Sequence, residues 1–180
     1  MYRLILALLL TPTLLVAQNR ATVAGSFGGL SGAANLNPTG TANWRLGWVA
    51  SLDATYWVHQ NVGVRASGSW AQDSLDGATL GGRGKFNKFA YSGDLVLRYP
   101  NSSSVTPYAV AGAGAVSLHQ LGSSSTFTKF AGDFGAGLEY RAGRWGIRAE
   151  GRDIVYKFDQ FGFNRTQHDI AWQGGVTVAF

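Results

Sequence analysis

Three histidines are the side chains in this sequence most able to bind a metal ion or to transfer a proton at neutral pH. They are His59, His119 and His168. No two of them have the spacing of metal ligands on one element, and no pair of carboxylates accompanies them. We therefore interpret them as loop or interfacial residues, and the sequence predicts no metal site and no cofactor.

A serine and a histidine two residues apart suggest a second kind of chemistry. Ser117 and His119 would share one face of a strand, where a hydroxyl nucleophile and a general base could act on a lipid. Their order and surroundings match no known catalytic motif closely, and the strand pattern described below places this face inside a barrel. We predict no catalytic residue, and a lipid-modifying enzyme is a less favoured hypothesis.

The composition limits the class of protein. The chain has 180 residues, of which 46% are apolar and 14% charged, with 25 glycines, 4 prolines and no cysteine. This balance is too apolar for a disordered chain, and the lack of several long apolar runs argues against a helical membrane protein. Without cysteine there is no disulfide and no thiol chemistry. The basic residues are scattered along the chain, so we expect no nucleic-acid binding.

Residues 1–17 have the pattern of a secretory signal peptide. Arg3 gives a positive start, residues 4–10 form an apolar core, and Ala17 is a small residue at the expected cleavage site. The apolar run is about half of the roughly 20 residues that a spanning helix needs. We predict a signal peptide at residues 1–17 and a single domain at residues 18–180.

The rest of the chain alternates apolar and polar residues with a period of two. Phe130, Phe134 and Leu138 share one phase, for example, while Asp133 and Glu139 share the other. This is the pattern of strands with one apolar and one polar face. Eight such runs are visible, at about 21–30, 43–57, 62–71, 88–99, 106–118, 128–141, 145–157 and 167–180. Short and long connections alternate between them, which predicts an all-β fold, an eight-stranded antiparallel up-and-down transmembrane β-barrel.

Alternation alone permits two kinds of barrel. A soluble lipocalin-like carrier has its apolar phase inside, whereas a membrane barrel has it outside. Aromatic residues where the strands meet the short turns favour the membrane barrel, because aromatic side chains suit a lipid–water interface. The interfacial aromatic girdle is predicted at Tyr56, Tyr99, Tyr108, Tyr140 and Trp145, together with Phe180. Trp44, Trp70, Phe89 and Phe130 are candidates for a second girdle at the other end.

The polar phase mixes small residues with charges of both signs, which suits a narrow lumen where long side chains pair across a gap. The predicted lumen charge network consists of Arg45, Asp53, Arg65, Asp94, Arg98, Asp133, Glu139, Arg148, Glu150 and Arg152, and the same phase holds Lys88, Lys129, Arg141 and Asp169. The alanines at 109, 111, 113 and 115 would face this lumen and leave room for arginines. Asp153 falls on the apolar phase, so we expect a β-bulge that turns it inward and turns Ile154, Tyr156 and Phe158 outward.

These features resemble the small outer-membrane β-barrel family of Gram-negative bacteria, with its OmpA/OmpX-like and opacity-type members. The resemblance is most specific at residues 174–180 and in the hairpin over residues 135–153. In that family a last strand with alternating apolar residues and a terminal aromatic is the signal read by the barrel-assembly machinery. The resemblance therefore implies that Val176, Val178 and Phe180 are the recognised positions. Function varies widely across the family, so the resemblance defines architecture better than activity.

The expected function is that of a non-enzymatic outer-membrane barrel presenting four outer loops, for envelope integrity or surface interaction. Its partners would be outer-membrane lipid, the barrel-assembly machinery and a surface ligand at the loops. A narrow channel for water or small ions is the second hypothesis, because walls rich in alanine and glycine can leave a gap. A lipid-modifying outer-membrane enzyme and a soluble lipocalin-like carrier are less favoured. The expected location is the outer membrane of a Gram-negative bacterium, after cleavage of the signal peptide.

Overall fold

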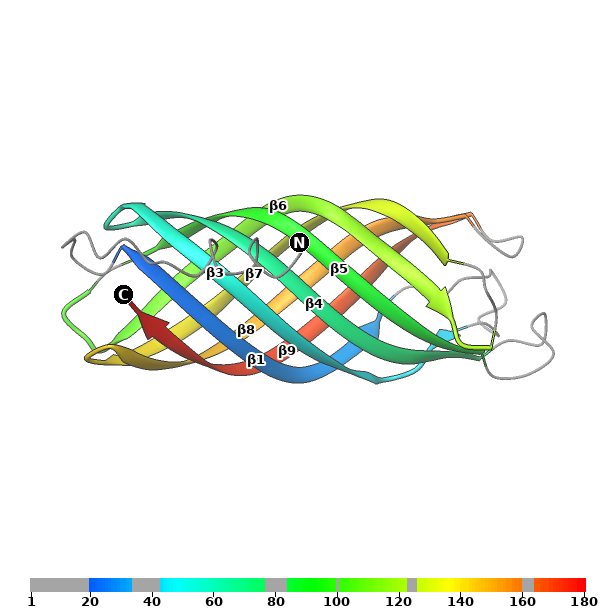
Figure 1. The fold of residues 1–180 in the computed structure, drawn as a ribbon, viewed down its shortest axis with the longest axis horizontal. Coiled ribbons are helices and arrows are strands. Elements are labelled where there is room, and N and C mark those ends of the chain that lie inside the picture. Colours follow the sequence, from blue (N-terminus) through cyan, green and yellow to red (C-terminus); the bar gives the residue numbers. More distant parts are fainter. Residues whose placement is uncertain (1–19, 34–42, 77–83, 100, 123–125, 160–163) are drawn as a thin grey trace, which may run out of the picture.

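A computed structural model describes residues 20–33, 43–76, 84–99, 101–122, 126–159 and 164–180. The signal peptide predicted at residues 1–17 lies outside the described residues. Within those ranges the regular structure consists of strands, which form one elongated barrel (Figure 1). No helix in the described part of the chain is long and apolar enough to cross a membrane.

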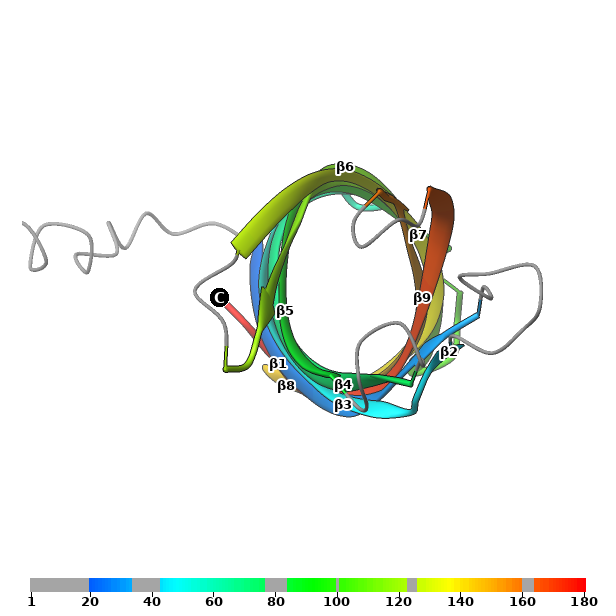
Figure 2. The same ribbon diagram turned by 90° about the vertical axis from the view of Figure 1, so that its right-hand side faces the viewer.

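Eight long strands pair in sequence order and close on themselves (Figure 2). All eight pairings are antiparallel, and the last strand returns to pair with the first. The strands are β1 (Ala21–Gly32), β3 (Gly47–His59), β4 (Val62–Asp76), β5 (Gly84–Arg98), β6 (Val105–Gln120), β7 (Thr126–Ala142), β8 (Trp145–Phe158) and β9 (Arg165–Ala179), and the two-residue β2 (Asn43–Trp44) adds to the end of β4. The predicted fold class, an eight-stranded antiparallel up-and-down barrel, is confirmed.

The strand register gives the barrel its width. A path across the sheet from Thr22 on β1 passes from partner to partner through all eight strands and returns to β1 ten residues further on, at Gly32. This stagger makes the strands tilt, and with eight strands it leaves an interior about wide enough to be filled by side chains. The contents of the lumen therefore decide whether the barrel is plugged or open.

The two ends of the barrel differ in the length of their connections. Short turns join β3 to β4 and β7 to β8 at the end where β1 begins and β9 finishes (Figure 1). There the backbone nitrogen of Phe180 donates to the oxygen of Ala21 at 2.8 Å, and Gly143 takes a φ of 64° in the β7–β8 turn. The four connections at the opposite end span 14, 7, 5 and 6 residues, counting β2 within the first, against 2, 6 and 2 residues at this end. In membrane barrels of this type the end with the longer connections faces the cell exterior.

The outer wall is apolar and the interior is charged, the reverse of a soluble protein. Leu52 and Ile147 on the outside are 65% and 61% exposed, whereas Arg65 and Asp94 inside are 4% and 3% exposed. The sequence left open a soluble carrier with an apolar interior. This distribution of residues contradicts a soluble carrier.

The predicted orientation of β6 was wrong. Its alanines at 109, 111, 113 and 115 belong to the outer phase, while Tyr108, Val110, Val116 and Leu118 are buried inside. Because both faces of β6 are apolar, alternation gives no information about which face points outward. Gly112 and Gly114 consequently face the lumen.

The predicted β-bulge at Asp153 is also absent. The pairing of β8 with β7 and with β9 is continuous through this residue. Asp153 therefore stays on the outer face, where its Oδ2 lies 2.8 Å from Nδ1 of His168. Tyr156 and Phe158 are buried in the lumen instead of facing outward.

Gly114 and Gly93 test how closely neighbouring strands approach. A Cβ atom at Gly114 would overlap the carbonyl oxygen of Tyr91 on β5, whereas a Cβ atom at Gly93 would meet nothing within 4 Å. We expect Gly114→Ala to lower the free energy of unfolding by about 1–3 kcal/mol, because overpacking forces backbone shifts. Gly93→Ala is the matched control and should change it by less than about 1 kcal/mol. Urea titrations of the refolded barrels measure both, and equal effects would contradict the close approach.

Candidate functional site

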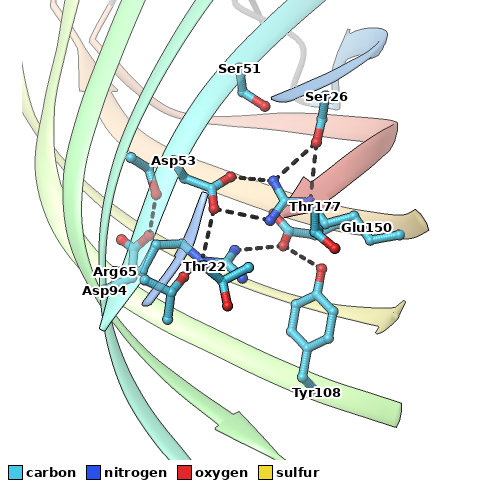
Figure 3. Close-up of polar contacts among 12 residues, drawn as sticks. Thr22, Ser26, Ser51, Asp53, Arg65, Asp94, Tyr108, Glu150 and Thr177 are labelled. Carbon is cyan, nitrogen blue, oxygen red and sulfur yellow. Dashed lines mark hydrogen bonds and ion pairs between the residues drawn. The ribbon is translucent and has the colours of Figure 1, made fainter. Parts of the chain in front are cut away.

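The centre of the lumen is crossed by two arginine–carboxylate pairs from β3, β4 and β8 (Figure 3). The Arg148 guanidinium contacts both carboxylate oxygens of Asp53 and also donates from Nε to Ser26 Oγ at 3.1 Å. Arg65 donates from Nη1 to Glu150 Oε2 at 2.7 Å. All four charged side chains are at most 8% exposed, and their formal charges cancel. Pairing of this kind compensates for the removal of the four charges from water.

Arg152 forms the next layer with two aspartates. Its Nη2 lies 2.5 Å from Asp94 Oδ2 and 2.5 Å from Asp133 Oδ1, and Nε donates to Asp133 at 3.0 Å. Ser67 and Ser92 accept further hydrogen bonds from the same guanidinium, at 3.3 and 3.2 Å. A planar guanidinium with five donors suits this many acceptors, which a lysine could not satisfy in the same geometry.

A buried lysine forms a third layer towards the end with the long connections. The Lys88 Nζ lies 2.8 Å from Asp73 Oδ2 and 2.8 Å from Asp169 Oδ2, and Tyr156 donates its hydroxyl to Asp169 at 3.1 Å. The indole ring of Trp44 covers the ammonium, with its centroid 3.7 Å from Nζ. A cation held against an aromatic face away from water is attracted to it. Trp44 on β2 therefore covers the charged layer inside the lumen, on the side that faces the long connections.

Apolar side chains fill the lumen on both sides of the central charges. One cluster consists of Trp44, Phe86, Val116, Leu118, Ala131, Tyr156 and Phe158, and another of Trp57, Val96, Tyr108 and Val110. Between them lies a cavity of about 20 Å³, lined in part by Ser51, Ser69 and Gln173. Such a volume holds about one water molecule. The lumen is thus plugged rather than open.

Seven of the ten residues predicted for the network meet in these central layers, and three lie elsewhere. Arg45 is exposed between β2 and β3. Arg98 lies at the short-turn end with its guanidinium 4.0 Å from the centroid of the Trp57 ring, and Glu139 pairs with Arg141 at 2.6 Å. All three lie near strand ends, where water enters and a charge needs no partner across the lumen.

Tyr108 was wrongly predicted to lie in the interfacial girdle. Its ring points into the lumen and is 7% exposed, with its hydroxyl donating to Glu150 Oε2 at 2.7 Å. The ring packs where a side chain at Gly137 would otherwise lie, because a Cβ there would meet the phenol carbon and oxygen of Tyr108. The missing side chain on β7 makes room for an aromatic ring inside.

The other predicted interfacial residues lie on the outer wall at the short-turn end. The exposed aromatics there are Tyr56, Tyr99, Tyr140, Trp145 and Phe180. Trp70, Phe89 and Phe130 are exposed on the outer wall towards the other end, whereas Trp44 is buried in the lumen. Val176 and Val178 share the outer phase of β9 with Phe180. Whether these three residues form an assembly signal stays a prediction.

The histidines and Ser117 do not form a catalytic arrangement in the structure. His59 is exposed and is the last residue of β3, next to the β3–β4 turn. Ser117 and His119 face outward from β6, and each contacts a threonine of β7: Ser117 Oγ lies 2.8 Å from Thr128 Oγ1 and His119 Nδ1 lies 2.9 Å from Thr126 Oγ1. The described residues contain no group of three His, Cys, Asp or Glu side chains that could hold a metal ion.

The sequence reasoning missed Asp73 and the role of Trp44. Asp73 follows the predicted end of a strand at residue 71, but β4 continues to Asp76 and places it inside. Two signals were present in the sequence. Alternation continues from Ala71 to Asp73, and Lys88 in the polar phase needs a buried acidic partner.

The sequence and the fold both match known proteins. Residues 4–180 match the outer membrane protein beta-barrel domain family. Neisserial surface protein A is 16% identical with a TM-score of 0.68, covering 89% of this chain and 97% of that chain.

Two further structures are similar over most of their length. OprG from Pseudomonas aeruginosa is 15% identical with a TM-score of 0.56, covering 89% of this chain and 95% of that chain. Ail of Yersinia pestis, solved in complex with the heparin analogue sucrose octasulfate, is 17% identical with a TM-score of 0.52, covering 89% and 99%. At these identities the likeness concerns the fold alone. No curated protein matches the chain.

Glu150→Gln tests the central pairs. The amide keeps the shape of the side chain but removes the closer of the two carboxylates that face Arg65, leaving only Asp53 Oδ1 at 3.6 Å, which Arg148 also contacts. The free energy of unfolding should therefore fall by about 3 kcal/mol. Arg141→Gln is the control, because the Arg141–Glu139 pair is partly exposed and should contribute less than about 1 kcal/mol. Urea unfolding in lipid vesicles measures both. A loss at Glu150 no larger than at Arg141 would contradict a stabilising central network.

Proposed function

Because the chain belongs to the outer membrane protein beta-barrel domain family, we propose that it is a non-enzymatic outer-membrane barrel whose rigid wall anchors four outer loops. The plugged, ion-paired lumen is the observation that carries this proposal. A barrel filled by paired charges and aromatic side chains has a stable interior and no room for a substrate. Its wall therefore serves to hold the loops at the surface, for envelope integrity or surface interaction.

The outer wall supports membrane insertion. Exposed aliphatic side chains such as Leu95, Ile147 and Val176 cover it between two levels of aromatic side chains. In outer-membrane barrels an apolar band about 25 Å tall lies between such aromatic levels. We infer that the protein resides in the outer membrane of a Gram-negative bacterium, with lipid and the barrel-assembly machinery as its partners.

A narrow channel is the competing function with the clearest structural requirement, a continuous lumen. Trp44, Phe86 and Phe158 pack edge to face, with ring centroids 5.3 and 6.0 Å from that of Trp44, and they occupy the end with the long connections. Beyond them Lys88 is held by two aspartates. Passage of ions would require both the aromatic packing and the ion pairs to break, so we do not favour a channel.

An outer-wall lipid hydrolase has one supporting observation, that Ser117 and His119 face the lipid side rather than the lumen. Each of them contacts a threonine instead of the other, and no carboxylate contact to His119 is present among the described residues. Activation of a serine requires a base within hydrogen-bond reach and a group that orients this base. We therefore infer a binding role rather than a catalytic one for this face.

Conductance of the refolded barrel tests the proposal. Residues 18–180 are refolded in detergent, and heat-modifiable gel mobility establishes that the barrel has formed. In planar bilayers we expect no steady conductance, because the aromatic cluster and the ion pairs fill the lumen. Steady step-like openings from heat-modifiable protein would contradict the plugged anchor and favour the channel.

A further inference from the structure

A groove on the outer wall lies at the end of the barrel with the long connections. It is lined by Trp70, Asn87, Phe89, Ser117, His119 and Thr126, which come from four consecutive strands, β4 to β7. These residues alternate with lumen residues such as Lys88, Val116 and Leu118, so their side chains face outward. Neither the lumen network nor the proposed anchoring function uses this groove.

The strand register arranges the groove in two rows. In the row nearer the barrel centre Trp70 pairs with Phe89, and Phe89 pairs with Ser117. In the row nearer the long connections Asn87 pairs with His119, and His119 pairs with Thr126. The first row begins with two large aromatic rings that are 50% and 51% exposed, and the second row is entirely polar.

The side chains of the polar row are held by hydrogen bonds that use only part of their polar groups. Gln72 donates from Nε2 to Asn87 Oδ1 at 3.0 Å, and His119 contacts Thr126 through Nδ1. These contacts use the amide oxygen of Asn87 and one ring nitrogen of His119. Among the described residues, the amide nitrogen of Asn87 and Nε2 of His119 have no hydrogen-bond partner, and Nε2 donates in the tautomer whose Nδ1 accepts from the Thr126 hydroxyl. None of the described residues that line the groove carries a carboxylate, and Lys85 is exposed two residues from Asn87 on the same face.

The depth of the groove in the membrane identifies the kind of ligand. Trp70 and Phe89 belong to the aromatic level of the outer wall, where lipid chains meet the headgroups. The polar row lies beyond this level, among the headgroups. A molecule that fills both rows must therefore have an apolar part towards the aromatics and an acceptor-rich, anionic part towards Asn87, His119 and Lys85.

We propose that this groove binds one outer-leaflet glycolipid, with its phosphorylated sugar headgroup on the polar row and an acyl chain along Trp70 and Phe89. An acyl chain is stabilised where it covers exposed aromatic rings, and phosphate oxygens accept hydrogen bonds from amide, imidazole and ammonium groups. The proposal rests on the proposed function, because membrane insertion places the polar row at the headgroup level.

The three histidines of the chain allow a residue-specific test. Protein with ¹⁵N-labelled histidine is refolded in detergent, and heat-modifiable mobility establishes that it has formed a barrel. Lipid A is then added, and the side-chain signals of His59, His119 and His168 are followed by NMR. We expect a saturable change at His119 and none at His59, which ends β3 at the opposite end of the barrel.

Two variants and two lipids sharpen the result. Asn87→Ala should weaken the response of His119 about tenfold, as expected for the loss of a hydrogen bond to a charged group. Thr166→Ala is the control, because Thr166 is exposed on the outer face of β9 and lies outside the groove. Dephosphorylated lipid A and phosphatidylglycerol should give a much weaker response.

The outcomes separate this inference from the proposed function. If the barrel forms but His119 does not respond to lipid A, the groove site is wrong and the barrel anchor stands. The same conclusion follows if dephosphorylated lipid A or phosphatidylglycerol gives a response as strong as that of lipid A. It also follows if Thr166→Ala weakens the response as much as Asn87→Ala does. An equal response of His119 and His168 would likewise overturn the groove, because it would indicate general lipid contact. If no heat-modifiable barrel forms in detergent, the proposed function itself fails.

Discussion

The structure depends on one constraint, that backbone groups within lipid must find their hydrogen-bond partners inside the protein. The pairing of β1 with β9 meets it by removing both edges of the sheet. Closure with eight strands and a stagger of ten residues then fixes a narrow interior. A narrow interior surrounded by lipid dictates the remaining features: apolar side chains must lie outside, and whatever lies inside must fill the space with its polar groups paired.

The interior is filled by three layers of ion pairs, each built from different charged residues. Arg148 and Arg65 each pair with a carboxylate, Arg152 connects two aspartates, and Lys88 lies between two more. Removing one partner from such a layer leaves a charge that water cannot reach, which is far more costly than losing an exposed pair. The aromatic clusters on either side exclude water and so strengthen the pairs. The same packing that stabilises the barrel leaves it without a pore.

Most of the architecture was predictable from alternation, because strands with one lipid face and one charged face leave a clear period of two. Asp53 on β3 and Arg148, Glu150 and Arg152 on β8, for example, lie in the lumen as their phase predicts. Errors arose where alternation carries no information. Both faces of β6 are apolar, so its orientation depends on the space left by Gly137 on the neighbouring strand, which admits the Tyr108 ring. One of the two partners of Lys88 was missed because Asp73 lies beyond the predicted end of its strand at residue 71, although the alternation continues to it.

Asp153 shows that the exclusion of charged residues from the outer wall depends on their depth in the membrane. Charges on the lipid face cost less towards the membrane interface than at its midplane, and Asp153 lies five residues before the end of β8. One of its carboxylate oxygens lies 2.8 Å from Nδ1 of the His168 ring, so the imidazole supplies a hydrogen-bond partner that water would otherwise supply. A β-bulge that turned Asp153 inward would also have turned Tyr156 and Phe158 into the lipid and removed them from the plug. Keeping Asp153 on the outer surface therefore preserves the packing of the lumen. This explains why the strand pairing of β8 continues without a bulge at Asp153, the one acidic residue on the predicted apolar phase.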